Sequence, residues 1–450
     1  MQRTHPISIE REEHELEHQA SSARPHRVVV VGGGIAGLEL ATKLPRAARK
    51  SSIALTLVDR EPAYVWKPML HTIAAGTSDV SQQETRYIAQ ARDRNFAFEP
   101  GELKGIDRKA RTVHLQPFKI GDRQILSERA IPYDSLILAI GSQANDFAIP
   151  GVRDHCFRID SRSQALAFNR EVQARMLESL AANSALHIAV VGGGATGVEL
   201  AAELIELTEI AARYGGTGLR DQLKVTLLES GARLLGAFPD RVAAAASKRL
   251  ETLGVTIVTS AKVIAAEADG FRLADGTRIR ADLLVWAAGV KAADTCASLD
   301  GLEATTNNQL VVEPTLQTTR DPRIFAIGDC SSLLLDPERK PLPSTAQVAH
   351  QQAGHLIRHL PAWIEGRALP HFKYRDFGSI VSLGGYGAYG SLGKFGFFNG
   401  GFIRGHVARL GHILLYRSHQ SRLHGFWRGG LLWLADTINS YVRPRLRLRH

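Results

Sequence analysis

The 450-residue sequence predicts an α/β fold, because two distant segments repeat one pattern of buried strand, glycine-rich turn and helix. The first copy is VVVVGGGIAGLEL at residues 28–40, and the second is IAVVGGGATGVEL at residues 188–200. Each copy has glycines at G-x-G-x-x-G spacing and is followed by a strand that ends in an acidic residue. Together these features predict two Rossmann-like dinucleotide-binding domains, which one glycine motif alone would indicate only weakly.

The glycine-rich turns are the expected phosphate-binding elements of both domains. Glycine lets the backbone turn tightly and approach a pyrophosphate, while the following helix N-terminus offers free N–H donors and a partial positive charge. The predicted nucleotide contacts are Gly32, Gly34, Ala36 and Gly37 in the first motif and Gly192, Gly194, Thr196 and Gly197 in the second.

An acidic residue ends the strand that follows each motif. Asp59 ends a strand predicted over 53–59, and Glu229 ends a strand predicted over 224–229. A carboxylate in this position accepts a hydrogen bond from an adenosine ribose hydroxyl. Glu229 would also repel a 2′-phosphate, so the second site is expected to prefer NAD over NADP, although nearby Arg233 weakens this inference. The alternative for Asp59 is a surface turn acid.

The other apolar segments predict further strands and the helices between them. The predicted strands cover residues 131–142, 255–258, 271–273, 282–289 and 319–329, a helix covers 165–182, and residues 379–401 form strands with tight turns. Ser344 or Thr345 is placed to cap a helix that begins near Ala346.

These elements divide the chain into four parts. Residues 1–26 are polar and lack an apolar signal-peptide core, so we expect a disordered extension. The first dinucleotide-binding domain is predicted to comprise residues 27–150 and 291–370, and the second residues 151–290. Residues 371–450 are predicted to form a C-terminal region for membrane association and dimerisation.

The overall composition is that of an ordinary globular protein, with 44% hydrophobic and 22% charged residues. The three cysteines, Cys156, Cys296 and Cys330, lie far apart and form no C-x-x-C pair. The sequence therefore predicts neither a disulfide framework nor a metal site, and a reducing compartment fits best.

Positive charge is concentrated at the C-terminal end. The formal net charge is +10, and residues 404–449 contain nine arginines and one acid, Asp436. Apolar residues at helical spacing over 405–415 and 426–442 predict two amphipathic helices, whereas a membrane span requires about 18 continuous apolar residues. This pattern favours attachment of residues 402–450 to an anionic lipid surface. The candidate apolar contacts are Phe402, Leu410, Ile413, Leu414, Phe426, Trp427, Leu431, Trp433 and Leu434.

Other interpretations of this C-terminal region stay open. Its helices could instead pack on the protein's own core or on a second subunit. A nucleic-acid partner is not expected, because the sequence contains no recognised nucleic-acid-binding module.

The order of motifs resembles that of two-dinucleotide flavoprotein reductases with a glutathione-reductase-like fold, and more closely that of type II NADH:quinone oxidoreductases. The likeness covers about residues 27–450 and rests on VVGGGIAGLEL, LVDR…YVWKPMLH, VVGGGATGVEL, TTRDPRIFAIGDC, AQVAHQ and the basic C-terminus. The resemblance implies an enzyme that transfers hydride from NADH to FAD and then two electrons to a membrane quinone, without pumping protons. It further implies a homodimer attached peripherally to the cytoplasmic face of a bacterial inner membrane.

The resemblance also assigns FAD to the first motif and NADH to the second. Asp59 would lie at the FAD ribose and Asp329 at the ribityl chain, while Glu199 would lie near the nicotinamide and the flavin. The further residues assigned on this basis are Arg60, Lys67, Gly141 and Ala346 for FAD and Gly289 for NADH. Ile140 departs from the family pattern, in which many members have threonine.

The family motif A-Q-x-A-x-Q falls on residues 346–351. It implies that Gln347 and Gln351 lie beside the flavin ring and the quinone headgroup, where an amide offers both a donor and an acceptor. Glu199 and Lys394 are the candidate proton donors to the quinone. From the residues alone, Glu199 is equally a first-turn acid that complements the helix dipole.

Two other enzymes share the two glycine motifs. A reductase of a soluble acceptor such as ferredoxin needs no amphipathic C-terminal region. A sulfide:quinone oxidoreductase requires a reactive cysteine pair, for which Cys156 and Cys330 are the only candidates. From a different class, a nucleic-acid-binding or signalling flavoprotein would use the arginine-rich end instead.

Overall fold

The computed structural model describes residues 24–48, 52–78, 84–213, 216, 218–336, 338, 340–392, 394–395, 398–399 and 402–442. Most of the predicted N-terminal extension, residues 1–23, and the last four arginines therefore lie outside the described residues.

The first domain is built on an eight-stranded sheet in the order β25-β22-β23-β24-β11-β1-β2-β5. The strands are β1 (His26–Val31), β2 (Ile53–Asp59), β5 (Ala97–Pro100), β11 (Ser135–Leu138), β22 (Leu310–Val312), β23 (Gln317–Thr318), β24 (Asp321–Ala326) and β25 (Ser331–Leu333). Strand β1 pairs in parallel with β11 on one side and with β2 on the other. The first glycine turn therefore follows β1 at the point where the strand order of the sheet reverses.

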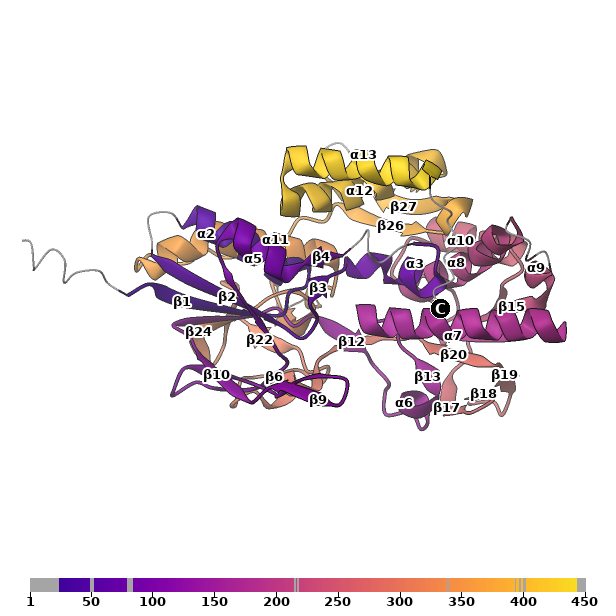
Figure 1. Cartoon of the computed structure of the whole chain (residues 1–450), viewed down its shortest axis with the longest axis horizontal. Coiled ribbons are helices and arrows are strands. Elements are labelled where there is room, and N and C mark those ends of the chain that lie inside the picture. The colour runs from indigo at the N-terminus through magenta and orange to yellow at the C-terminus, as the bar shows by residue number, and fades with distance from the viewer. Residues whose placement is uncertain are drawn as a thin grey trace, which may run out of the picture.

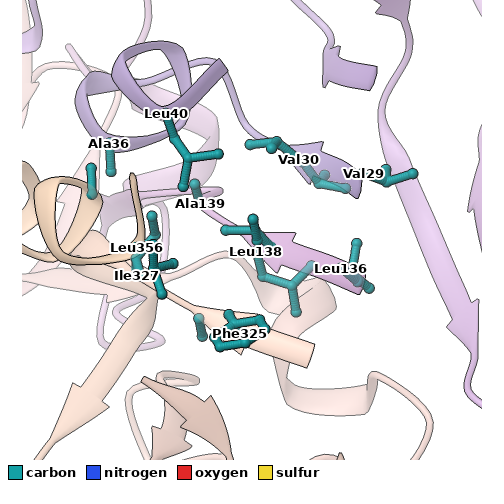
Figure 2. Packing of buried hydrophobic residues seen from close by; sticks show 14 of the residues in the cluster. Val29, Val30, Ala36, Leu40, Leu136, Leu138, Ala139, Phe325, Ile327 and Leu356 are labelled. Carbon is teal, nitrogen blue, oxygen red and sulfur yellow. The ribbon is translucent and has the colours of Figure 1, made fainter. Parts of the chain in front are cut away.

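Two helices from opposite ends of the sequence cover one face of this sheet. They are α2 (Ile35–Ala47) and α11 (Ala346–Ile364), which pack against each other. Figure 2 shows Leu40 of α2 beside Ala139 and Leu356 of α11 beside Ile327, and all four side chains are buried. Continuous apolar strands suit a parallel sheet covered on both faces.

The second domain repeats the plan around a five-stranded parallel sheet in the order β13-β20-β14-β15-β16. Its elements are β13 (Cys156–Phe157), β14 (Leu186–Val191), β15 (Leu223–Leu228), β16 (Thr256–Val258) and β20 (Leu283–Trp286), with helices α7 (Arg162–Ala182), α8 (Ala195–Ala212) and α10 (Asp240–Thr252). The chain crosses between the domains through β12 (Ser142–Ala144) and β21 (Val290–Ala292), which form an antiparallel pair. Figure 1 shows the two domains side by side.

Antiparallel ribbons are attached to both domains, and of their strands only the one over 271–273, within β18, was predicted. They are the sheet of β6 (Leu103–Asp107), β7 (Thr112–Leu115) and β10 (Arg129–Pro132), the sheet of β17 (Val263–Glu267), β18 (Gly270–Leu273) and β19 (Arg278–Arg280), and the pair β8 (Phe118–Ile120) and β9 (Arg123–Leu126). The remaining short elements are β3 (Ala63–Tyr64), β4 (Thr85–Arg86), β28 (Lys394–Phe395), β29 (Phe398–Asn399), α3 (Leu70–Ala75), α5 (Tyr87–Arg94), α6 (Val152–His155) and α9 (Leu219–Gln222), with 3-10 turns at Lys67–Met69, Asp294–Ser298, Gly328–Cys330 and Gly384–Tyr386.

The C-terminal region forms a separate layer, yellow and orange in Figure 1, over both domains. It consists of the sheet β26 (Gly378–Ser382), β27 (Ala388–Leu392) and β30 (Phe402–Arg404), followed by α12 (His406–His424) and α13 (Phe426–Val442). The first helix extends nine residues past the expected end at residue 415, because His419 and Leu423 on its inner face are buried. His419 stacks on Trp66 and contacts the hydroxyl of Tyr64 at 2.8 Å.

Candidate nucleotide-binding and redox site

The first glycine turn leaves open space only where a ligand would lie. A Cβ at Gly32 would lie 2.3 Å from the carbonyl oxygen of Ala139, and a Cβ at Gly37 would lie 1.8 Å from that of Gly32. At Gly34, by contrast, a Cβ would meet no atom within 4 Å. Gly34 is also the N-cap of α2 and supplies no side-chain cap, so the helix N-terminus is left for an anion.

The second glycine turn has the same geometry. A Cβ at Gly192 would approach the backbone of Ala287 to 2.7 Å, and a Cβ at Gly197 would approach the carbonyl oxygen of Gly192 to 2.0 Å. Gly194 again has no neighbour within 4 Å and begins α8 without a side-chain cap. Both motifs therefore form a cradle that fits a pyrophosphate.

The acid that ends the next strand braces each cradle. Asp59 accepts hydrogen bonds from the backbone N–H groups of Gly33 at 2.5 Å and Glu61 at 2.8 Å. Glu229 accepts equivalent bonds from Gly193 at 2.7 Å and Gly231 at 2.6 Å. Burial raises the pKa of Asp59, while these backbone hydrogen bonds act against that rise. Each carboxylate lies against the turn that it was predicted to serve.

The guanidinium of Arg233 is engaged by groups of the protein itself. It donates to the carbonyl oxygens of Leu235 at 3.1 Å and Phe238 at 3.0 Å, and it pairs with Asp240 at 3.2 Å. A guanidinium engaged in this way has fewer donors to offer a 2′-phosphate. The proximity of Arg233 in the sequence therefore does little to weaken the expected preference for NAD.

Substituting Glu229 with alanine is expected to raise kcat/KM for NADPH about tenfold and to lower it for NADH. The reason is that the variant loses the ribose acceptor and its repulsion of a 2′-phosphate, a change of about 1.4 kcal/mol in relative binding. Steady-state kinetics with both nucleotides measure the effect. Adding Arg233→Gln should leave the NADPH kinetics of this variant unchanged, and a loss would show that Arg233 binds the phosphate.

The start of α11 and the loop after β24 complete the first site. Gly328 has a φ of +71°. A Cβ at this position would lie 3.4 Å from the methyl group of Ala349 and 3.9 Å from that of Ala36. The N–H of Gly328 donates to the amide oxygen of the fully buried Gln352 at 2.6 Å. Thr345 caps α11 through Val348 N–H, which agrees with the predicted cap. Sequence reasoning missed Gln352, because only its contact with Gly328 reveals its role.

Hydrogen bonds join Asp329 to Ser142 and Ser142 to Lys67 in the first site. Ser142 donates its hydroxyl to Asp329 at 2.7 Å, and Lys67 donates to the carbonyl oxygen of Ser142 at 2.7 Å. The structure thus brings Lys67 and Asp329, both assigned to FAD, to one place. Gly141 has φ of +78° and open space beside it, while Arg60 lies at the surface and donates to Glu102 at 3.3 Å.

Two buried acids lie one turn apart on α8. Glu199 accepts from Ser382 N–H at 2.9 Å and lies 3.4 Å from Nδ1 of His71. Glu203 accepts from the hydroxyl of Thr77. Burial raises the pKa of Glu199 to about 8 and that of Glu203 to about 7. Both acids can therefore hold a proton near neutral pH, and the sequence pointed only to Glu199.

Replacing Glu203 with glutamine is expected to stabilise the protein at pH 8 but not at pH 5. Because folding raises the pKa of Glu203 from 4.5 to about 7, the wild-type carboxyl costs stability increasingly as pH rises between these values. The cost reaches about 3 kcal/mol above pH 7, which glutamine avoids. Denaturant unfolding at both pH values measures it, with exposed Glu251→Gln as the control. An equal gain at pH 5 would contradict the assignment.

The structure places Gln347 and Gln351 along one face of α11, facing the segment that leads into β26. Gln347 accepts from Phe377 N–H at 2.6 Å and donates to the carbonyl oxygen of Gly378 at 3.2 Å. Gln351 does the same with the N–H and carbonyl of Arg375, at 3.0 and 2.7 Å. Both side-chain amides thus hold the backbone of residues 375–378 in place, and their predicted contacts with the flavin and the quinone stay a prediction. The side chain of the other candidate, Lys394, lies outside the described residues.

Two of the three cysteines, Cys296 and Cys330, are buried, and Cys156 is partly buried. All three are free, and burial raises the pKa of Cys156 to about 12 and that of Cys330 to about 11. A thiol with so high a pKa is a poor nucleophile. The two candidates for a sulfide-oxidising pair also lie in different domains, Cys156 in β13 and Cys330 in the 3-10 turn after β24.

Two such cradles on two Rossmann-like domains define a two-dinucleotide flavoprotein reductase. The pyridine nucleotide-disulphide oxidoreductase family model matches residues 26–353. A type II NADH:quinone oxidoreductase of Haemophilus influenzae is 41% identical over 442 residues, which cover 94% of this chain and 99% of that protein. The chain thus belongs to this family and, within it, to the type II NADH:quinone oxidoreductases.

Solved structures agree at the level of the fold. The structure of NDH2 from Plasmodium falciparum in complex with NADH superimposes with a TM-score of 0.81 at 18% identity, covering 95% of this chain and 100% of that one. The sulfide:quinone oxidoreductase of Aquifex aeolicus superimposes with a TM-score of 0.70 at 19% identity, covering 89% and 92%. Both classes therefore share the fold, and the 41% identity to the Haemophilus influenzae enzyme is what distinguishes them for this chain.

Proposed function

We infer that this chain oxidises NADH and reduces a quinone, using FAD bound at the first glycine turn. The matched pair of cradles at Gly34 and Gly194 supports two dinucleotides bound at once, and the 41% identity to a type II NADH:quinone oxidoreductase supports the quinone. Bound FAD supplies the redox chemistry, accepting hydride from NADH and passing two electrons to the quinone.

The chain's own groups bind and orient the two nucleotides. The N–H groups of Ala346 and Gln347, at the start of α11, have no acceptor within the described part of the chain, so this helix end is available to stabilise negative charge. Glu199 and Glu203 can store or release a proton beside the C-terminal sheet. Assignment of the proton donor to Glu199 or Lys394 remains part of the proposal.

The direct test is oxidation of NADH with a short-chain quinone, repeated with NADPH. We expect a yellow protein that oxidises NADH rapidly and NADPH poorly. A preparation without flavin absorbance, or one that reduces ferredoxin but no quinone, would contradict the proposal.

Beyond its bonds to residues 377 and 378, the Gln347 amide keeps one N–H and one oxygen lone pair, and we propose that these contact the quinone. Gln347→Ala is then expected to lower the rate of quinone reduction about tenfold, equivalent to one contact worth about 1.4 kcal/mol, while NADH-driven flavin bleaching changes little. Stopped-flow measurement separates the two half-reactions. Gln351→Ala removes an equivalent clamp one turn along, at the second glutamine assigned to the quinone, and is expected to lower quinone reduction in the same way. Equal loss of both half-reactions in Gln347→Ala would assign this residue a purely structural role.

We also propose that the C-terminal layer attaches the enzyme to the membrane surface. Half of the twenty exposed large apolar side chains identified in the described chain lie on α12 and α13, including Trp427, Leu431 and Trp433. No helix in the described chain is both long and apolar enough to cross a bilayer. The exposed face therefore fits a helix pair lying in the interface, on the cytoplasmic side where NADH is available.

Not all of the residues that the sequence assigned to lipid contact are available for it or lie among the described side chains. The side chains of Phe402 and Phe426 lie outside the described residues. Arg417 pairs with Asp436 at 2.7 Å and Arg428 with Asp93 at 2.5 Å, so these two arginines serve the protein's own packing as well. The inner face of α12 packs on the first domain, which leaves α13 to meet lipid or a second copy in the proposed homodimer.

A further inference from the structure

A cavity of about 210 Å³ lies where α2 and α5 meet the corner between α12 and α13. Four of the seven lining residues carry positive charge, and none carries negative charge. The lining residues are Thr42, Lys43, Arg46, Arg94, Arg422, Leu423 and Gly425. Such a cluster of cations repels itself unless an anion lies between them.

Two of the four cations are fixed in place by uncharged groups. Arg94 donates to the carbonyl oxygen of Leu423 at 2.8 Å, and its Nε is buried without a partner. Burial, followed by repulsion from Arg46 and Arg428, lowers the pKa of Arg94. Arg422 contacts the ring of His350 and donates to Ser418 at 2.8 Å. Both guanidiniums are thus preorganised but lack a carboxylate partner.

The nearby acids are already engaged. Glu39 is buried between Lys43, at 2.5 Å, and the ring of His350. Asp93 pairs with Arg428 at 2.5 Å. The Arg46 guanidinium has no acceptor in the part of the chain that the structure describes. Together with Arg428, the four cations of the lining make five positive charges. Glu39 and Asp93 supply two negative charges, so three positive charges are uncompensated.

The cavity lies next to the exposed apolar surface of α13, and this position indicates what kind of anion would bind there. Gly425 ends α12, and the indole of Trp427, two residues later, is 82% exposed. The exposed apolar face of α13 continues from there through Leu431 and Leu434. A ligand in the cavity would therefore have its charged end beside the arginines and an apolar surface next to it.

We propose that this cavity binds the phosphate group of an anionic phospholipid. Guanidiniums recognise phosphate oxygens through paired N–H donors, and interfacial basic pockets bind lipid headgroups. The proposal rests on the membrane attachment inferred above. It adds a specific site, at which one bound headgroup would join α2 and α5 to the α12–α13 corner.

The test uses the full-length holoenzyme and its Arg46→Gln variant, with Arg92→Gln as the matched control. Arg92 is an exposed cation on α5 that does not line the cavity. We expect wild-type enzyme to bind phosphatidylcholine vesicles containing phosphatidylglycerol more tightly than vesicles of phosphatidylcholine alone. Arg46→Gln should reduce that difference about tenfold, whereas Arg92→Gln should reduce it less than fivefold, the general effect of one surface charge. Flavin content and circular dichroism check that each variant is folded.

Several outcomes would overturn the proposal. If Arg46→Gln and Arg92→Gln weaken binding equally, only general electrostatics acts. If millimolar inorganic phosphate displaces phosphatidylglycerol, the cavity is a free-phosphate site. If the wild type binds no vesicles, membrane attachment fails, and titration calorimetry with dihexanoyl-phosphatidylglycerol in solution then tests the cavity separately. Saturable binding that Arg46→Gln abolishes would support the site, and its absence would reject it.

Discussion

Replacing Gly194 with valine is expected to abolish reduction of the flavin by NADH while leaving the protein folded and yellow. A Cβ at this position meets no protein atom within 4 Å, so we expect the valine side chain to enter the space proposed for the NADH pyrophosphate. Loss of the pyrophosphate contacts should lower kcat/KM for NADH by about a thousandfold or more, equivalent to about 4 kcal/mol. Stopped-flow flavin bleaching with NADH, compared with dithionite, measures this loss.

Gly34→Val is the matched variant in the other cradle. Its side chain also enters open space, so the protein should fold but lose FAD. Absorbance at the flavin band after gel filtration measures retention. If Gly34→Val retained flavin, or if Gly194→Val lost it, the assignment of the two cradles would be reversed or wrong.

Replacing Trp427, Leu431, Trp433 and Leu434 with serine is expected to release the enzyme from membranes. Each side chain is more than half exposed and belongs to the face assigned to lipid. Burying a side chain of this kind contributes about 1.5 kcal/mol or more, so the four together should change partitioning by at least about a hundredfold. Vesicle sedimentation in low and high salt measures it.

The control for this variant replaces apolar residues that are exposed elsewhere. Ile120 and Ile125, on the ribbon of β8 and β9, suit this purpose. Their substitution with serine should not affect sedimentation. If the four-serine variant stays on vesicles but becomes monomeric, α13 is a dimer interface, which was the alternative for this region.

The strand, turn and helix around each glycine motif could be predicted from the sequence because local rules decide them. Apolar strands need a covered sheet, and Gly32 and Gly192 need positive φ at the tight turn, with values of +101° and +115°. The strands that lead to Asp59 and Glu229 were located for the same reason, and the binding of a ribose by either acid stays a prediction. Helix α12 was predicted too short, because the residues that extend it are polar in sequence but packed against Trp66.

The sequence by itself thus determined two dinucleotide cradles, the acids that brace them and a basic amphipathic end. Only the tertiary structure placed Glu203 in a buried site, turned Gln347 and Gln351 toward the backbone of residues 375–378, and gathered cations from α2, α5 and α12 around one cavity. The physical reason is separation along the chain. Glycine turns and strand periods act over a few residues, whereas burial, pKa and charge clustering depend on groups that meet only after the chain has folded.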